Sequence, residues 1–238
     1  MALSLREHGY YPPPVGARPS RNAVEAFRQT PPRPIENALV DRVYAALSPV
    51  YDLLFGAPLQ PGRRAAMAAL GVRPGDRVLE IGTGTALTAT LYPRHCRVTA
   101  VDLSASMLRR ARARLARGGL RHVRLLAADA ARLTFPDASF DRVFAPYVIS
   151  VVPDPVQVVR EMRRVCRPGG RIVLLNHFRS ANALAARIER TLSPVTVRVG
   201  FRTDVDLRAV LEAAELRTAD VQKVNWPPIW SVVVCLRD

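Results

Sequence analysis

The chain has 238 residues, of which 49% are apolar, and its formal net charge is +15, with Lys223 as the single lysine among 35 Lys and Arg residues. This size suits one substantial α/β core, and the positive charge favours a partner that carries phosphate groups. No stretch approaches the ~20 apolar residues of a membrane-spanning helix, and the three cysteines are too far apart for a zinc motif or a disulfide framework.

The N-terminal part of the chain differs in pattern from the rest. Residues 1–34 read as a Pro/Arg-rich arm, because their prolines disfavour helix at several points. Residues 35–60 are expected to form a cap of two amphipathic helices, with apolar residues recurring on one face and a hinge at Ser48-Pro49. The first residues, MALSLREHGYYPPP, have no apolar core of signal-peptide type, so a cytoplasmic location is expected.

Strands and helices are predicted to alternate through the remainder of the chain. After a helix around 63–70, the strand candidates are RVLEIG, RVTAVDL, HVRLLAAD, FDRVFAPY and RIVLLNH. Helical stretches are predicted near 85–92, 104–117, 155–165, 181–192 and 205–215. The 155–165 helix has Asp154 as N-cap, and the sequence places its stop at Pro168-Gly169-Gly170. Two last strands, 216–224 and 230–236, are expected to form an antiparallel hairpin after a parallel, doubly wound sheet.

A glycine-rich loop follows the first of these strands in LEIGTGTALT, residues 79–88. The segment matches neither the dinucleotide pattern Gly-x-Gly-x-x-Gly nor the phosphate loop of NTPases. Gly82 and Gly84 would allow close approach of a ligand and offer amides to a carboxylate, whereas Glu80 would repel phosphate and attract an ammonium group. A ligand with both an amino acid end and a nucleoside would fit these residues.

Acidic residues end the next two strands. Asp102 can accept hydrogen bonds from both hydroxyls of a ribose, and Asp129 from the amino group of an adenine. Helix capping is an alternative role for Asp102, although Ser104 already supplies that cap. Met107 can pack on the adenine or belong to the ordinary core.

These residues resemble the signature of class I S-adenosylmethionine-dependent methyltransferases, over roughly residues 77–175. The resemblance implies a Rossmann-like α/β fold in residues 61–238, with a seven-stranded, mostly parallel sheet and an antiparallel C-terminal hairpin. One departure is Ala86, which replaces the third glycine and is expected to be a mild change. The implied cofactor is S-adenosylmethionine, released as S-adenosylhomocysteine, with no metal. The expected cofactor residues are Tyr44, Glu80, Gly82, Gly84, Thr85, Asp102, Leu103, Met107, Asp129 and Ala130.

Three aromatic or imidazole side chains are candidates for the chemistry. Methyl transfer needs a positioned, unprotonated nucleophile. Tyr51, Tyr147 and His177 can attract a methylammonium group, orient an amine or receive its proton. Each also has a simpler explanation as a packing or strand-end residue. A single proline precedes Tyr147, unlike the Asn/Asp-Pro-Pro-aromatic loop of enzymes that methylate nucleic acid amines.

Three segments further resemble the bacterial phosphatidylethanolamine N-methyltransferases that associate with membranes. They are VYAALSPVYDLLFGAPLQPGRRAA, YVISVVPDPVQVVREMRRVCRPGGRIVLLNHF and the W-P-P turn before the last strand. The resemblance implies stepwise methylation of phosphatidylethanolamine towards phosphatidylcholine, with Tyr44 and Tyr51 closing the site and Tyr147 and His177 near the amine. The arginine excess and the amphipathic cap suit an anionic leaflet, so a monomer on the inner face of the membrane is expected. The arginines expected at this surface are Arg179, Arg187, Arg190 and Arg198.

Two other functions remain open on the sequence. A soluble methyltransferase of a quinone precursor or a secondary metabolite would share every cofactor residue and would act without lipid. A nucleic-acid-binding protein is suggested by the charge alone, and the chain lacks a clear aromatic stacking surface, so no specific nucleic acid partner is expected.

Overall fold

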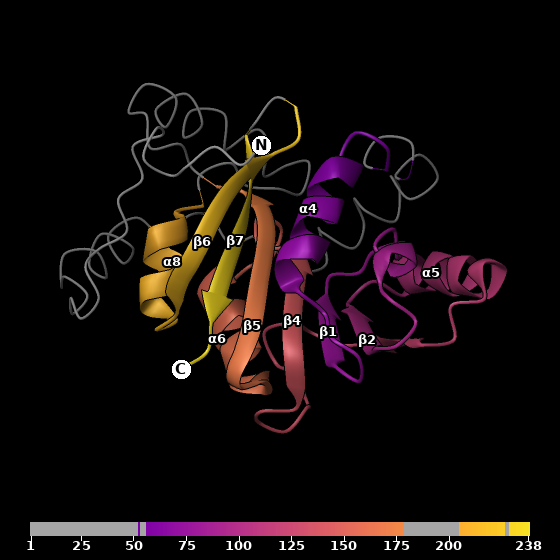
Figure 1. The fold of residues 1–238 in the computed structure, drawn as a ribbon, viewed down its shortest axis with the longest axis horizontal. Helices are drawn as coiled ribbons and strands as arrows, with labels where there is room; N and C mark the ends of the chain where they lie inside the picture. The colour runs from indigo at the N-terminus through magenta and orange to yellow at the C-terminus, as the bar shows by residue number, and fades with distance from the viewer. Residues whose placement is uncertain (1–51, 53–55, 179–204, 227–228) are drawn as a thin grey trace.

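The computed structural model describes residues 52, 56–178, 205–226 and 229–238. They form one seven-stranded sheet in the order β3-β2-β1-β4-β5-β7-β6, with helices on both faces (Figure 1). The strands are β1 (Arg77–Ile81), β2 (Arg97–Asp102), β3 (Val123–Ala127), β4 (Phe140–Pro146), β5 (Cys166–His177), β6 (Arg217–Val224) and β7 (Trp230–Leu236). The helices are α4 (Gln60–Leu70), the 3-10 turn η2 (Ala89–Leu91), α5 (Ala105–Gly118), α6 (Pro155–Val165) and α8 (Leu207–Ala213).

The direction of the strands confirms the predicted sheet. Strands β1 to β5 pair in parallel, and β7 runs antiparallel to both of its neighbours, β5 and β6. The strand order reverses between β1 and β4, since the chain first adds strands on one side of β1 and then on the other. Ligands of doubly wound sheets bind beyond the carboxyl ends of the strands at such a reversal.

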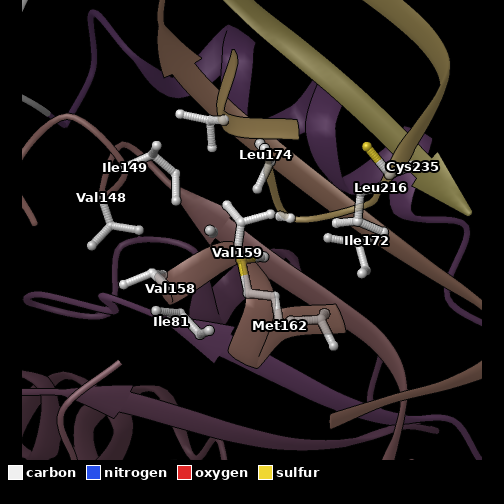
Figure 2. Close-up of a cluster of buried hydrophobic side chains, with 14 of the residues drawn as sticks. Ile81, Val148, Ile149, Val158, Val159, Met162, Ile172, Leu174, Leu216 and Cys235 are labelled. Atoms are coloured by element: carbon white, nitrogen blue, oxygen red, sulfur yellow. The ribbon is translucent and has the colours of Figure 1, made fainter. Parts of the chain in front are cut away.

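Two hydrophobic clusters cover the two faces of the sheet. Helices α4 and α5 pack on one face, and α6 and α8 on the other. Figure 2 shows Val159 and Met162 of α6 among Ile81, Ile172 and Leu174 of the sheet, all of which are buried. Each strand with both faces covered is a nearly continuous apolar run, as expected for parallel strands.

Local signals in the sequence fix several helix ends. The Asp154 side chain accepts a hydrogen bond from the Gln157 amide at 2.9 Å, which caps α6 where the sequence predicted. Helix α6 ends at Val165, as predicted, but the chain becomes extended directly at Cys166, and Pro168-Gly169-Gly170, which were expected to stop the helix, lie inside β5. The residue before a proline avoids the helical region, which favours this early change to strand geometry.

The helix predicted near residues 85–92 was wrong. The chain there forms turns and the single 3-10 turn η2. Ala86 has φ of 59°, in the left-handed region, which a right-handed helix cannot include. The arm, residues 35–51 and 53–55 of the N-terminal cap, and the helix expected near 181–192 lie outside the described residues. Within the described residues, no helix is long and apolar enough to cross a bilayer.

The left-handed alanine leads to a stability prediction. Replacing Ala86 by Gly is expected to leave the free energy of unfolding unchanged or to raise it by up to about 1 kcal/mol. The left-handed conformation costs an alanine about 1–2 kcal/mol, which outweighs the loss of about 0.8 kcal/mol for one buried methyl group. Urea unfolding of the purified variant would measure the change.

A matched control is Ala111→Gly in the middle of α5, where the alanine is equally buried. This change removes the same methyl group and a helix-favouring residue, so it should lower the free energy of unfolding by about 1–2 kcal/mol. Equal losses in the two variants would contradict a left-handed Ala86.

Candidate functional site

A cavity of about 570 Å³ opens beyond the carboxyl ends of β1 to β4. Sites for small ligands commonly enclose roughly 300–1,000 Å³, so this volume suits a nucleoside-sized molecule. The cavity brings together most of the described residues that the sequence predicted for the site. They are Gly82, Gly84, Asp102, Leu103, Met107, Asp129, Ala130 and Tyr147.

Gly82 is required by close packing across the strand reversal. Its φ is +68°, and a Cβ at this position would lie 2.5 Å from Cγ2 of Val148. The amides of the loop are already engaged, because Gly82 donates to the carbonyl of Val101 at 2.9 Å and Gly84 donates to Asp102 Oδ2 at 2.7 Å. The glycines therefore provide room at the cavity wall, and the expected donation of their amides to a ligand carboxylate does not fit this arrangement.

The two strand-end acids are oriented by backbone amides. Asp102 accepts hydrogen bonds from Gly84 N at 2.7 Å and from Ser104 N at 2.9 Å. Ser104 itself caps α5, which removes the capping explanation for Asp102. Asp129 accepts from Ala131 N at 2.9 Å in the same local pattern. A carboxylate can accept about four hydrogen bonds, so each acid is held in place with capacity for a ligand hydroxyl or amino group.

An apolar part of the cavity lies between α6 and the loop after β3. It is lined by Met107, Val151, Val152, Val158 and Ala130, which suits the faces of a purine ring. Two polar lining residues, Arg132 and Gln157, were not predicted from the sequence. The sequence around Arg132 and Gln157 indicates only that these positions are polar, and it gives no sign that they line a cavity.

Glu80 does not line the cavity. It is buried on the other face of β1 from Leu79 and Ile81, beside Thr83 and Tyr92. Within the described residues, Oε1 of Glu80 and the hydroxyls of Thr83 and Tyr92 are buried without a hydrogen-bond partner of good geometry. Burial raises the pKa of the Glu80 carboxyl to about 7, and the nearby hydroxyls and the charge of Arg63 offset only part of this effect. An unsatisfied carboxyl oxygen directly behind the glycine loop fits the ammonium group of an amino acid ligand.

Thr85 is also buried away from the cavity, where it joins the loop to two other segments. Its hydroxyl donates to Asp52 Oδ1 at 2.6 Å, and its carbonyl accepts from Arg114 Nε at 2.8 Å. Arg114 also forms an ion pair with Asp52. These contacts place Asp52 directly against the loop after β1.

Tyr147 lies at the end of β4 with a φ of 57° and is one of the residues that line the cavity. Its hydroxyl donates to the carbonyl of Leu59 at 3.1 Å and accepts from Asn225 Nδ2 at 3.0 Å. The guanidinium of Arg63 lies 5.1 Å from the ring centroid. Burial raises the pKa of the Tyr147 phenol, so the hydroxyl stays protonated.

Asn225 connects Tyr147 to the start of α4. Its Oδ1 accepts from the amide of Gly62 at 2.7 Å, across 163 residues of sequence. A Cβ on Gly62 would lie 2.7 Å from the Tyr147 hydroxyl, so this contact also requires a glycine. Sequence reasoning missed Asn225 and Arg63. The one signal for Asn225 was its place in a turn, where its φ of 65° suits asparagine.

His177 ends β5 and does not line the cavity. Its Nδ1 lies 2.9 Å from the carbonyl oxygen of Ile229, and because a carbonyl only accepts, Nδ1 carries the proton and Nε2 is the acceptor atom of the neutral ring. Strand alternation puts His177 on the same face as Leu175, in the cluster against which Tyr147 packs. Both side chains therefore lie at the same edge and face of the sheet.

The remaining predicted site residues lie outside the described ranges. They are Tyr44, Tyr51, Arg179, Arg187, Arg190 and Arg198. In the part of the chain that the structure describes, no group of His, Cys, Asp or Glu could hold a metal ion. All three cysteines are buried, and burial raises the pKa of the Cys235 thiol to about 12.

The buried glutamate gives a pH prediction for the ligand-free protein. Because the folded state raises the pKa of Glu80 from 4.5 to about 7, it binds a proton that the unfolded chain has released. The free energy of unfolding should therefore fall by up to about 3 kcal/mol between pH 4.5 and 7, relative to Glu80→Gln. Urea unfolding at several pH values would test this, with Glu215→Gln at an exposed glutamate as control. Parallel curves for the wild type and Glu80→Gln would contradict it.

Comparisons with known proteins agree with this geometry. A family model described as a methyltransferase domain matches residues 79–174. A phosphatidylethanolamine N-methyltransferase of Cereibacter sphaeroides is 40% identical over 172 residues, which cover 72% of this chain and 84% of that protein. A demethylmenaquinone methyltransferase of Mycolicibacterium paratuberculosis is 39% identical over 127 residues, 53% of this chain and 52% of that protein.

Solved structures support the fold. A methyltransferase from Aquifex aeolicus, described as dependent on S-adenosylmethionine, has a TM-score of 0.60 at 18% identity and covers 80% of this chain and 98% of its own. The glycine loop, the two oriented acids and the apolar part of the cavity suit a ligand of that kind. The chain belongs to the class I S-adenosylmethionine-dependent methyltransferases and is related to the bacterial phosphatidylethanolamine N-methyltransferases.

Proposed function

We propose that the protein transfers methyl groups from S-adenosylmethionine to the amine of phosphatidylethanolamine, of its mono- and dimethyl forms, or of all three, at a membrane surface. The observation that carries this proposal is the extent of similarity to the Cereibacter sphaeroides enzyme, which includes 84% of that protein. The similarity to the demethylmenaquinone enzyme of Mycolicibacterium paratuberculosis includes only about half of either chain.

The described residues divide the task in a way that suits this reaction. The cofactor supplies an electrophilic methyl group, so the protein has to hold it and present an unprotonated amine. Asp102 is suited to a ribose and Asp129 to an adenine, while Gly82 leaves room for close approach. Glu80 lies behind the loop as a counter-charge for an ammonium group.

The amine would be received between Tyr147 and His177. Tyr147 is a lining residue whose hydroxyl is held by two hydrogen bonds, and a tyrosine face attracts a methylated ammonium group. His177 would take the proton of the amine on Nε2, since its Nδ1 proton is committed to the Ile229 carbonyl. Tyr44 and Tyr51 are proposed to close the site, and Arg179, Arg187, Arg190 and Arg198 to contact anionic headgroups.

A quinone precursor is the second candidate substrate, on the basis of the relatives that act in menaquinone synthesis. A quinone precursor would be methylated on a carbon atom. The reaction would involve no lipid headgroup and would give no cationic product. It shares the cofactor residues, so only the acceptor distinguishes the two functions.

The acceptor can be identified by product analysis. Purified protein would be incubated with radiolabelled cofactor and anionic vesicles that contain phosphatidylethanolamine or its mono- or dimethyl form. A parallel reaction would contain demethylmenaquinone. We expect label in the phospholipid fraction. Label in the quinone alone, with cofactor binding intact, would overturn the proposal.

The role of His177 can be tested on the same substrate. Replacement of His177 by Gln should lower kcat about 100-fold, because general base catalysis typically contributes at least that much, while the affinity for S-adenosylhomocysteine stays unchanged. His95→Gln, at an exposed histidine away from the cavity, is the control. A loss of cofactor affinity equal to the loss of kcat would instead assign His177 a structural role.

A further inference from the structure

The exposed large apolar side chains are distributed unevenly over the sheet edges. Among the described residues they are Leu103, Trp226, Ile229 and Leu236, with exposed fractions of 47%, 89%, 43% and 44%. Since β7 runs antiparallel to both β5 and β6, the turn between β6 and β7 lies at the carboxyl edge, where the cavity opens. Leu236 lies at the opposite edge, where β7 ends. Three of the four therefore lie on the side of the cavity mouth.

The residues on either side of Trp226, Asn225 and Ile229, are hydrogen-bonded to residues of the candidate site. Asn225 is bonded to the Gly62 amide and to the Tyr147 hydroxyl, and the Ile229 carbonyl accepts from His177. Trp226 follows Asn225 directly and is almost fully exposed. Trp230, four residues later, packs against the core cluster on the α4 face. Trp226 is therefore exposed beside residues that are hydrogen-bonded to the site, whereas Trp230 is partly buried against the core.

We infer that Trp226 and Ile229, between β6 and β7, form a membrane-docking element and that Trp226 enters the headgroup region of a bilayer. An indole has an apolar body and one N–H donor, which suits the depth between water and acyl chains. The neighbouring Ile229 adds apolar surface, and the net charge of +15 matches an anionic leaflet. The inference rests on the proposed function, in which the substrate amine belongs to a lipid.

Docking through this turn has a direct consequence for the site. Asn225, which precedes Trp226, and Ile229 contact the side chains proposed to receive the amine. A bilayer that accepts Trp226 would therefore face the cavity mouth with its headgroups. The lipid would need to move only its headgroup, while its acyl chains stay in the bilayer.

Tryptophan fluorescence of the full chain tests the inference without any assay of methyl transfer. The chain has two tryptophans, so Trp230→Phe leaves Trp226 as the single reporter. On addition of vesicles of phosphatidylethanolamine and phosphatidylglycerol, its emission should shift to shorter wavelength, and bromine-labelled acyl chains should quench it. In the Trp226→Phe variant, Trp230 should respond to neither.

A binding assay supplies the matched pair of variants. Trp226→Ala should weaken sedimentation with these vesicles about tenfold, the loss expected for one interfacial aromatic anchor. Leu236→Ala, at the apolar residue exposed on the opposite edge, should leave it unchanged. Equal binding by the two variants would overturn the inference.

Other occupants of the turn would be recognised in the same experiments. Emission of Trp226 that is already blue-shifted and shielded from acrylamide before lipid is added would mean that another part of the chain or a second copy covers it, which overturns the inference. Unchanged emission while the protein still sediments with vesicles would place the membrane contact elsewhere and would overturn it too.

Failure of the docking turn and failure of the proposed function give different results. Insertion of Trp226 without methylation of any phosphatidylethanolamine would keep the docking element and remove the proposed substrate. Methylation on vesicles that is unaffected by Trp226→Ala would keep the proposed substrate and remove the docking element. If both hold, Trp226→Ala should raise the KM for vesicle lipid and leave the turnover of a monomeric short-chain phosphatidylethanolamine unchanged.

Discussion

Close packing between Gly82 and Val148 determines how the loops of the site can be arranged. The two residues follow β1 and β4, the neighbouring strands between which the strand order reverses, and even one methyl group on Gly82 would collide with the valine. With the chain this close, the loop after β1 turns back so that the Gly82 amide reaches Val101 and the Gly84 amide reaches Asp102. The orientation of Asp102 therefore depends on the close approach of Gly82 and Val148 elsewhere in the cavity wall.

The second organising contact joins three distant parts of the chain. Asn225 links the turn before β7, the end of β4 and the start of α4 through the Tyr147 hydroxyl and the Gly62 amide. A tyrosine that makes two hydrogen bonds through its hydroxyl is fixed in orientation but is poorly suited to accept a proton. This separates positioning from proton transfer at the amine site and leaves the latter to a residue on β5.

The parts of the structure that could be predicted are those set by local chemistry. Helix α6 was placed correctly at its start because Asp154 and Pro155 act within one turn, and Asp102 and Asp129 were found because a parallel strand ends in a defined direction. The loop at Ala86 was misjudged because its left-handed φ is imposed by tertiary packing. Arg63 and Asn225 were missed because their partners are far away in sequence, and Glu80 lies behind the glycine loop instead of in the cavity lining because its side of β1 faces the interior.

The position of β7 has a consequence for how the chain is made. This strand follows all the others in sequence, yet it lies between β5 and β6 in the sheet. Within the described residues, β6 pairs with β7 alone, so it has no neighbour until β7 has been synthesised. The pairing of β7 with β5 joins segments that are distant in sequence, and such pairing is slow to form. A nascent chain would therefore display an open edge of β5 and an unpaired β6 until β7 has emerged from the ribosome.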